Sequence, residues 1–297
     1  LFPQNFPQFD VILGADFENN ISKASLLSSP NDFVNSLSVN YEASVFDADI
    51  VEYCDYSLLK PQLYNEFLAK GKTAFTYLSF GCPYKCTYCI RTYNLNAAFF
   101  RNSKNIFEEL SYFANQGYDN IRILDDNCTL SKSVLREIKD FCELKNIKFN
   151  FYGLTRIDLI DDEIIELLKD LNFKRVFIGI ESFDKDRIKE YQKGKYAELD
   201  EIRKKVSLLI NSGIEVGVFL LFNPLNENWK SVRIALKKLR TLPFQYAGIS
   251  YLIPYPGTKF FDSNIDKIEM GFSPYYSVKF KEKSSSLNIF TQYYFII

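Results

Sequence analysis

Three cysteines, Cys82, Cys86 and Cys89, lie within eight residues of one another in the segment Cys-Pro-Tyr-Lys-Cys-Thr-Tyr-Cys. This C-x3-C-x2-C spacing offers three thiolate ligands. A cubane [4Fe–4S] cluster normally binds four cysteine thiolates, so three would leave one iron open to a small molecule. The spacing therefore favours a reactive iron–sulfur cluster over one that only transfers electrons.

Two simpler interpretations of the cysteines compete with the cluster. A structural zinc site needs four closed ligands, but the chain has no histidine, and Cys54, Cys128 and Cys142 have no C-x2-C partner. Alternatively, the three cysteines could be buried as small hydrophobic residues. Gly81 and Lys85 instead indicate a polar loop. We therefore expect Cys82, Cys86 and Cys89 to bind iron.

Composition limits the partners and the compartment. The chain has 297 residues, of which 47% are hydrophobic, with 36 basic and 37 acidic residues. This balance gives no electrostatic support for binding nucleic acid or an anionic membrane. The longest apolar stretch, residues 216–222, is too short to span a bilayer. Six cysteines in a chain of this size do not form a disulfide framework, so we expect a reducing, cytoplasmic location.

Strand and helix patterns alternate after the cysteines. A helix is expected after Asn105, a second begins at Ser131, and a third has an acidic first turn from Asp161, which suits the helix dipole. Such alternation predicts an α/β fold with parallel strands and right-handed crossovers. Six units are too few for a closed eight-stranded barrel, which favours a partial (βα)6 barrel. The expected strands are residues 72–80, 120–124, 148–154, 175–180, 214–222 and 246–253.

Polar residues follow several of these strands. In parallel α/β folds, ligands bind at the carboxyl ends of the strands. Any one of these segments could be ordinary loop chemistry, but their placement at one rim of the barrel predicts a ligand site. The segments are Asp125–Cys128, Gly153–Arg156, Gly179–Ser182, Phe222–Pro224 and Pro254–Thr258.

The cysteine motif, with Tyr88 before its last cysteine, resembles the radical S-adenosylmethionine (radical SAM) enzymes. Further segments extend the resemblance over residues 72–262, towards the branch that often carries an N-terminal cobalamin-binding domain. They are Ile123–Asn127, Thr155–Asp158, Gly179–Ser182 and Tyr255–Thr258. The resemblance implies a [4Fe–4S] cluster that holds S-adenosylmethionine and cleaves it reductively to a 5'-deoxyadenosyl radical.

The same resemblance implies roles for individual residues. Arg156 corresponds to a residue near the carboxylate of the cofactor, which suits a fixed bidentate cation. Tyr88 would lie against the adenine. The amino group and ribose would be held at the ends of the second and fourth strands, by Asp125, Asp126, Asn127, Glu181 and Ser182.

Two positions depart from the family pattern. Residues 222–227, Phe-Asn-Pro-Leu-Asn-Glu, lack the two glycines that relatives commonly have after this strand, which predicts altered adenine packing. Cys128 stands where relatives commonly have an aromatic residue. Its thiol could face the barrel mouth and donate a hydrogen atom to a substrate radical. Alternatively, Cys128 is a small apolar filler of the core.

The remaining segments bear on domain organisation. We expect an N-terminal segment at residues 1–71, a radical SAM core at 72–262 and a C-terminal extension at 263–297. Residues 8–28 resemble the tail of a cobalamin-binding domain, yet no histidine is present to coordinate cobalt. The chain begins with Leu1 rather than methionine, so cobalamin is expected only if such a domain lies upstream.

The leading functional hypothesis is hydrogen abstraction from a small molecule or peptide of unknown identity, with an electron donor such as flavodoxin or ferredoxin. Neither nucleic acid nor a membrane is expected as a partner. Two alternatives are a cobalamin-dependent radical SAM methyltransferase and a non-catalytic iron–sulfur binding protein.

Overall fold

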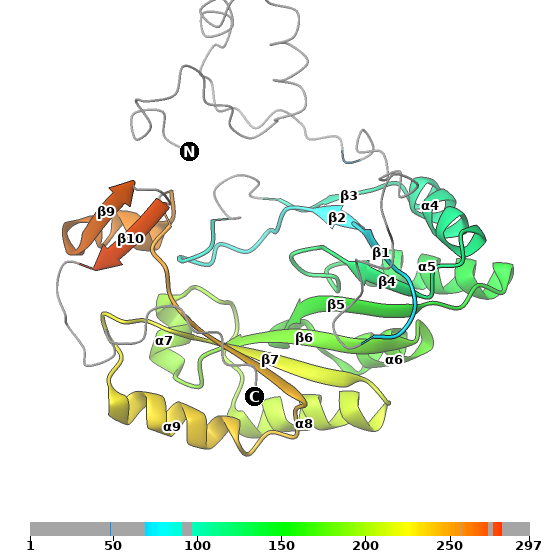
Figure 1. The fold of residues 1–297 in the computed structure, drawn as a ribbon. Coiled ribbons are helices and arrows are strands. Elements are labelled where there is room, and N and C mark those ends of the chain that lie inside the picture. Colours follow the sequence, from blue (N-terminus) through cyan, green and yellow to red (C-terminus); the bar gives the residue numbers. More distant parts are fainter. Residues whose placement is uncertain (1–47, 49–68, 91–96, 256, 273–275, 281–297) are drawn as a thin grey trace, which may run out of the picture.

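A computed structural model describes residues 48, 69–90, 97–255, 257–272 and 276–280 (Figure 1). Residues 8–28, which resemble the tail of a cobalamin-binding domain, lie outside these residues. Cys54 lies outside them as well.

Six parallel strands form one sheet, in the order β1-β4-β5-β6-β7-β8. Each strand pairs with the next unit of the chain, as right-handed βα units require. The expected α/β partial barrel is therefore confirmed, and β1 and β8 form the two edges of the sheet. The strands are β1 (Thr73–Thr76), β4 (Asn120–Ile123), β5 (Asn150–Arg156), β6 (Phe173–Glu181), β7 (Glu215–Phe222) and β8 (Tyr246–Tyr251).

Helices lie outside the curve of this sheet (Figure 1). They are α4 (Ser103–Asn115), α5 (Lys132–Lys145), α6 (Asp162–Asp170), α7 (Lys185–Glu190), α8 (Leu199–Asn211) and α9 (Trp229–Leu239). Their buried residues recur at helical spacing, for example Ile106, Leu110 and Phe113 on α4. Burial of this face against the strands is what holds each helix to the sheet.

The two faces of the sheet differ because side chains alternate along each strand. Val176 and Ile178 of β6 are fully buried in the core shared with the helices. Phe177 between them lies on the opposite, concave face and stacks on Phe219 of β7, with ring centroids 5.2 Å apart. Gly217 makes room for this ring, since a Cβ there would overlap Phe177. The concave face is thus lined by half-buried rings.

Two helix starts agree with the sequence and one does not. Ser131 and Asp161 accept hydrogen bonds from Val134 N and Ile164 N as N-caps. For α4 the N-cap is Asn102, not Asn105, because the extended backbone at Asn102 lets its side chain accept from Lys104 N at 2.9 Å. The helix therefore begins one turn earlier than predicted.

The segment expected as one strand at 72–80 is divided. β1 ends at Thr76, and β2 (Ser79–Phe80) leaves the main sheet to pair antiparallel with β3 (Phe99–Phe100). This change of direction carries the chain from the edge of the sheet into the cysteine segment.

Beyond β8 the chain forms a short helix, α10 (Lys259–Asp262), and an antiparallel hairpin of β9 (Ile268–Phe272) and β10 (Tyr276–Phe280). The hairpin stands apart from the main sheet (Figure 1). None of the helices in the described part of the chain is long and apolar enough to cross a membrane.

Candidate metal centre and cofactor site

The three cysteines follow β2, and none of them is in a disulfide bond between described residues. Cys86 is buried, while Cys82 and Cys89 are half-buried. Among the described residues, no three His, Cys, Asp or Glu side chains converge on a single metal-ion position. A mononuclear zinc site would need such convergence. Thiolates that each bind a different iron of a cubane do not need to converge in this way.

Backbone hydrogen bonds fix the middle of the cysteine loop from two sides. Thr87 N donates to Tyr191 O at 2.9 Å, and the Thr87 carbonyl accepts from Phe260 N of α10 at 2.8 Å. Within the loop, Cys89 N donates to Cys86 O at 3.1 Å. The loop is therefore held by the segment after α7 and by the chain beyond β8.

Arg156 at the end of β5 contacts the cysteine loop directly. Its Nη1 donates to Cys86 Sγ at 3.4 Å, and its guanidinium lies 3.7 Å from the centre of the Tyr84 ring. Asp158 accepts two further hydrogen bonds from Arg156, both at 2.9 Å, and the Lys193 carbonyl accepts another. Burial alone would lower the pKa of Arg156, but Asp158 and Cys86 outweigh it and raise that pKa.

Glu181 lies on the same concave face, at the end of β6. The register of β6 shifts between Gly179 and Glu181, and Glu181 adopts a left-handed backbone with φ of 63°. Its carboxylate pairs with Lys193 Nζ at 2.9 Å. A Cβ at Gly179 would lie 2.6 Å from Glu181 Oε1 and 3.0 Å from Lys193 Nζ, so a larger residue there would require this pair to shift. Gly179 is the register partner of Arg156. Arg156 and Glu181 therefore lie at the ends of neighbouring strands.

Tyr88 lies between these groups. Its ring meets that of Tyr191 edge-on at 5.1 Å. Burial raises the pKa of Tyr88, and the negative charges of Glu181, Cys86 and Cys89 raise it further. The ring is thus close to both the cysteines and Glu181.

The turn after β4 serves two purposes. Asp125 is buried and accepts from Leu78 N at 2.8 Å and Ser79 Oγ at 2.6 Å, which ties this turn to the segment leading into the cysteines. Asp126 is exposed, and its charge is among those that raise the pKa of Cys82, after burial itself. Asp125 is therefore placed to position the loop, and Asp126 to face solvent near it.

Asn127 is buried and has one unused donor. Its Oδ1 accepts from Thr129 Oγ1 and from Thr155 Oγ1, each at 3.2 Å. Its Nδ2 has no hydrogen-bond partner among the described residues. Because an unpaired buried amide costs free energy, this atom indicates a site where a ligand or water would bind.

Cys128 lies on the other side of the sheet from Arg156. Its Sγ packs against Gly153, where an added Cβ would lie 2.6 Å from the sulfur. Gly153 precedes Arg156 by three residues, so the two face opposite sides of β5. Cys128 is 3% exposed and belongs to the core shared with the helices. Burial raises its pKa to about 12. This geometry favours the core-filler interpretation over a hydrogen-atom donor at the barrel mouth.

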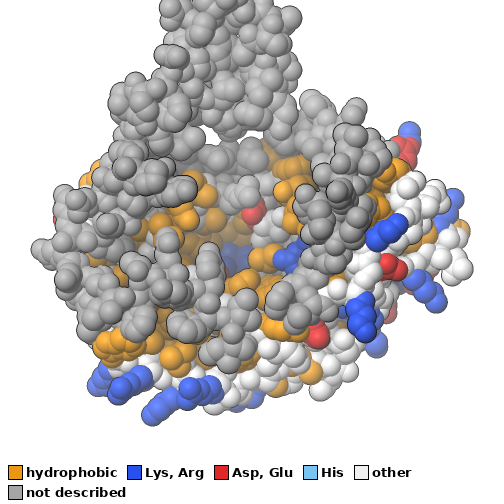
Figure 2. Space-filling model, viewed as in Figure 1, with side chains coloured by type: hydrophobic (Ala, Val, Ile, Leu, Met, Phe, Trp, Pro, Cys, Tyr) orange, Lys and Arg blue, Asp and Glu red, His pale blue; other side chains and the backbone are white. Residues whose placement is uncertain are grey.

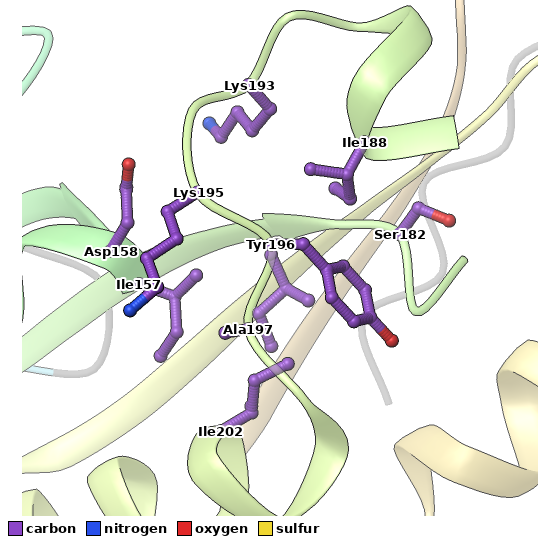
Figure 3. A pocket seen from close by; sticks show the side chains of 10 residues that line it. Ile157, Asp158, Ser182, Ile188, Lys193, Lys195, Tyr196, Ala197 and Ile202 are labelled. Atoms are coloured by element: carbon purple, nitrogen blue, oxygen red, sulfur yellow. The ribbon is translucent and has the colours of Figure 1, made fainter. Parts of the chain in front are cut away.

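Ser182 lines a small pocket behind the strand ends (Figure 3). Its hydroxyl accepts from Asp184 N at 3.1 Å. In Figure 3, Ser182 and Lys193 lie on opposite sides of the pocket. Most of the lining between them is apolar, including Ile157 and Ile188.

The segment after β7 is ordered without the missing glycines. Asn223 is fully buried; its Oδ1 accepts from Leu225 N at 3.0 Å, and its Nδ2 donates to Glu190 at 3.1 Å. A side-chain turn thus takes the place of the glycine-rich turn expected from relatives.

Sequence reasoning did not identify four residues that complete the site: Tyr84, Asp158, Tyr191 and Lys193. The segment containing Asp158 was recognised, but Lys193 lies in a short polar stretch without a motif. Its role depends on the left-handed turn at Gln192 and Gly194, which only the folded chain reveals.

In the space-filling view, a few charged side chains are visible among hydrophobic side chains near the centre (Figure 2). Lys and Arg side chains also gather along the lower edge of this view.

Comparison with known proteins places the chain among enzymes with this architecture. The model of the radical SAM superfamily matches residues 76–239. The chain is similar to the hopanoid C-3 methylase of Methylococcus capsulatus, with 26% identity over 187 residues that cover 60% of this chain and 34% of the methylase. It is similar to the bacteriochlorophyllide d C-8(2)-methyltransferase of Chlorobaculum tepidum, with 22% identity over 239 residues that cover 76% and 52% of the two chains. The chain thus spans about a third to a half of these relatives.

Among solved structures, the chain resembles the radical SAM methyltransferase TsrM from Kitasatospora setae, determined with cobalamin and a [4Fe-4S] cluster bound. The TM-score is 0.62 at 19% identity, covering 69% of this chain and 40% of TsrM. At this identity the likeness shows the fold alone.

Proposed function

The chain belongs to the radical SAM superfamily, a family of enzymes that use a [4Fe–4S] cluster and S-adenosylmethionine, and we propose that it cleaves S-adenosylmethionine reductively to abstract hydrogen from a substrate. The single observation that carries this proposal is the loop of three cysteines that meets Arg156, at the end of β5, while Glu181 lies at the neighbouring end of β6.

The residues of the site fit these two cofactors. Cys82, Cys86 and Cys89 would hold three irons and leave the fourth for the cofactor. None of the three cysteines is in a disulfide bond between described residues, and the loop is fixed by hydrogen bonds to Tyr191 and Phe260. When bound, the reduced cluster supplies the electron that breaks a carbon–sulfur bond of the cofactor.

The chain's own residues would bind and orient the cofactor. Glu181, held at a fixed strand end by Lys193, would accept hydrogen bonds from the amino group or ribose hydroxyls. Tyr88 would present its ring to the adenine, and Arg156 would keep a positive charge beside the cysteine loop. Asp125 would position the loop through its contacts with Leu78 and Ser79, and not by touching the cofactor.

A second candidate function is cobalamin-dependent methyl transfer. The names of the methylase and methyltransferase relatives favour it. Such chemistry would need a corrin-binding region in addition to the residues described, and the chain spans only part of its relatives.

Anaerobic reconstitution tests these candidates. The chain is loaded with iron and sulfide, reduced with dithionite or reduced flavodoxin, and incubated with S-adenosylmethionine. The leading proposal gives 5'-deoxyadenosine and methionine in equal amounts. S-adenosylhomocysteine formed only when cobalamin is added would favour methyl transfer. An intact cluster that forms neither product would leave a non-catalytic iron–sulfur protein as the best account.

A further inference from the structure

We propose that Arg156 is a positioning residue that raises the reduction potential of the cluster through an N–H···S hydrogen bond to Cys86, an inference that rests on the proposed binding of the cluster by the three cysteines.

Arg156 makes a hydrogen bond to a cysteine sulfur of the loop. Nη1 lies 3.4 Å from Cys86 Sγ, and Cys86 is the most deeply buried cysteine of the three. Hydrogen bonds to the cysteine sulfurs, together with burial and nearby charge, set the potential of an iron–sulfur cluster. A guanidinium supplies both the hydrogen bond and a permanent positive charge.

Hydrogen bonds and an aromatic ring fix the guanidinium in this position. Asp158 binds Nε and Nη2 with two hydrogen bonds, and the Lys193 carbonyl accepts from Nη2. The Tyr84 ring covers one face of the group. The side chains of Arg156 and Asp158 are only 6% and 13% exposed. Apart from Nη1, which points at Cys86, the donors of Arg156 are thus largely occupied by the protein.

Gly194 permits this arrangement. It has φ of +99°, and a Cβ there would lie 2.5 Å from Asp158 Oδ2 and 2.6 Å from Arg156 Nη2. A side chain at this position would press on both members of the pair. The turn after α7 therefore fixes the cation as well as the cysteine loop.

The expected effect follows from charge. Reduction adds one electron to the cluster, so a fixed donor and positive charge at Cys86 favour the reduced state over the oxidised state. A hydrogen bond involving a charged group stabilises by about 1.5 kcal/mol, which is roughly a tenfold change in an equilibrium constant. For a one-electron couple, tenfold corresponds to about 59 mV.

The experiment is a redox titration of the reconstituted cluster without S-adenosylmethionine, followed by the electron paramagnetic resonance signal of the reduced state. At a fixed solution potential, Arg156→Gln should lower the ratio of reduced to oxidised cluster about tenfold. Arg156→Lys keeps the charge without the planar fork, and Asp158→Asn keeps the arginine without its clamp. In both variants the ratio of reduced to oxidised cluster should lie between that of Arg156→Gln and that of the wild type.

Arg136→Gln is the matched control. Arg136 lies on the outer face of α5, half-exposed and paired with Glu163, so this variant removes one positive charge away from the loop. It should leave the potential unchanged. An equal shift in Arg136→Gln would assign the effect to net charge and overturn the inference.

A second measurement keeps the inference testable if Arg156→Gln loses its cluster. Resonance Raman spectra of the wild-type cluster in H2O and D2O should differ in the iron–cysteinate stretching region, because an N–H···S bond exchanges its proton. Identical spectra, or unchanged potentials in Arg156→Lys and Asp158→Asn, would refute the role. If Arg156 serves only the cofactor carboxylate, its variants lose affinity for S-adenosylmethionine while the cofactor-free potential stays constant. Failure of wild type to bind iron would instead refute the proposed function.

Discussion

The location of Cys128 gives a sharp test, since Gly153 is buried directly against it. In Gly153→Ala the new Cβ would lie 2.6 Å from Cys128 Sγ and 3.2 Å from Cys128 Cβ. Gly153 does not have the positive φ that would strain an alanine. The substitution should therefore destabilise the fold through overpacking alone. Overpacking of a core typically lowers the free energy of unfolding by about 1–3 kcal/mol.

The sulfur atom accounts for most of this clash. In a Cys128→Ala background the 3.2 Å contact to Cβ remains, which needs a shift of a few tenths of an ångström, together with an ordinary van der Waals contact of 3.4 Å to Phe173. We expect Cys128→Ala alone to cost about 1 kcal/mol through the small cavity it leaves. In that background Gly153→Ala should then lower the free energy of unfolding by less than about 1 kcal/mol. The coupling energy between the two substitutions is therefore about 1–2 kcal/mol.

Urea unfolding of the cluster-free protein under reducing conditions, followed by far-ultraviolet circular dichroism, measures all four members of this cycle. Cys142→Ala is the matched control, because Cys142 is another buried cysteine in the same core and makes none of the close contacts at Gly153. It should not relieve Gly153→Ala. If Gly153→Ala lowered the free energy of unfolding equally in the wild-type and the Cys128→Ala backgrounds, the packing argument would be refuted. A role for Cys128 at the barrel mouth would then be open again.

Three further predictions concern the site. Glu181→Gln should keep its cluster but bind S-adenosylmethionine about tenfold more weakly in calorimetric titration, as loss of a charged hydrogen bond implies; unchanged affinity would count against the role of Glu181. Gly194→Ala should lower the free energy of unfolding by about 1–3 kcal/mol in urea, because the left-handed backbone and the clash with Asp158 add; a neutral effect would contradict the clamp. Burial raises the pKa of Asp125 to about 7 despite its hydrogen bonds to Ser79 and Leu78. The folded state therefore binds the proton more tightly than the unfolded state, so this group lowers stability as pH rises from about 4 to 7, by up to about 1.4 kcal/mol per unit. Asp125→Asn should remove that slope, and an identical slope in the variant would exclude Asp125 as its source.

The partial barrel could be predicted because its information is local. Apolar runs that alternate with amphipathic helices, and caps such as Ser131 and Asp161, indicate the strand–helix units without reference to the rest of the chain. The segment expected as one strand at 72–80 is an exception, because it divides after Thr76. The exact ends of the helices were less predictable, because neighbouring residues compete for the N-cap position. Asn105 is a plausible cap by residue type, but the extended backbone at Asn102, three residues earlier, makes Asn102 the N-cap.

The three cysteines could be singled out from the sequence because their spacing is a local feature, but the groups that contact them could not. Lys193 reaches Glu181 and Arg156 from twelve and thirty-seven residues away in sequence. The side of the sheet on which Cys128 lies depends on how the turn after β4 packs on Gly153, which composition does not encode. Such contacts arise from tertiary packing, so sequence patterns alone could not separate a thiol at the barrel mouth from one in the core.

The central claim is that Cys82, Cys86 and Cys89 bind a [4Fe–4S] cluster. It is tested most directly by iron and sulfide analysis with Mössbauer spectroscopy after anaerobic reconstitution, comparing wild type with the variant in which all three cysteines are alanine and with Cys142→Ala. We expect about four irons per chain and a cubane spectrum in wild type and Cys142→Ala, and loss of both in the triple variant. A full cubane in the triple variant, or no cluster in wild type, would contradict the account.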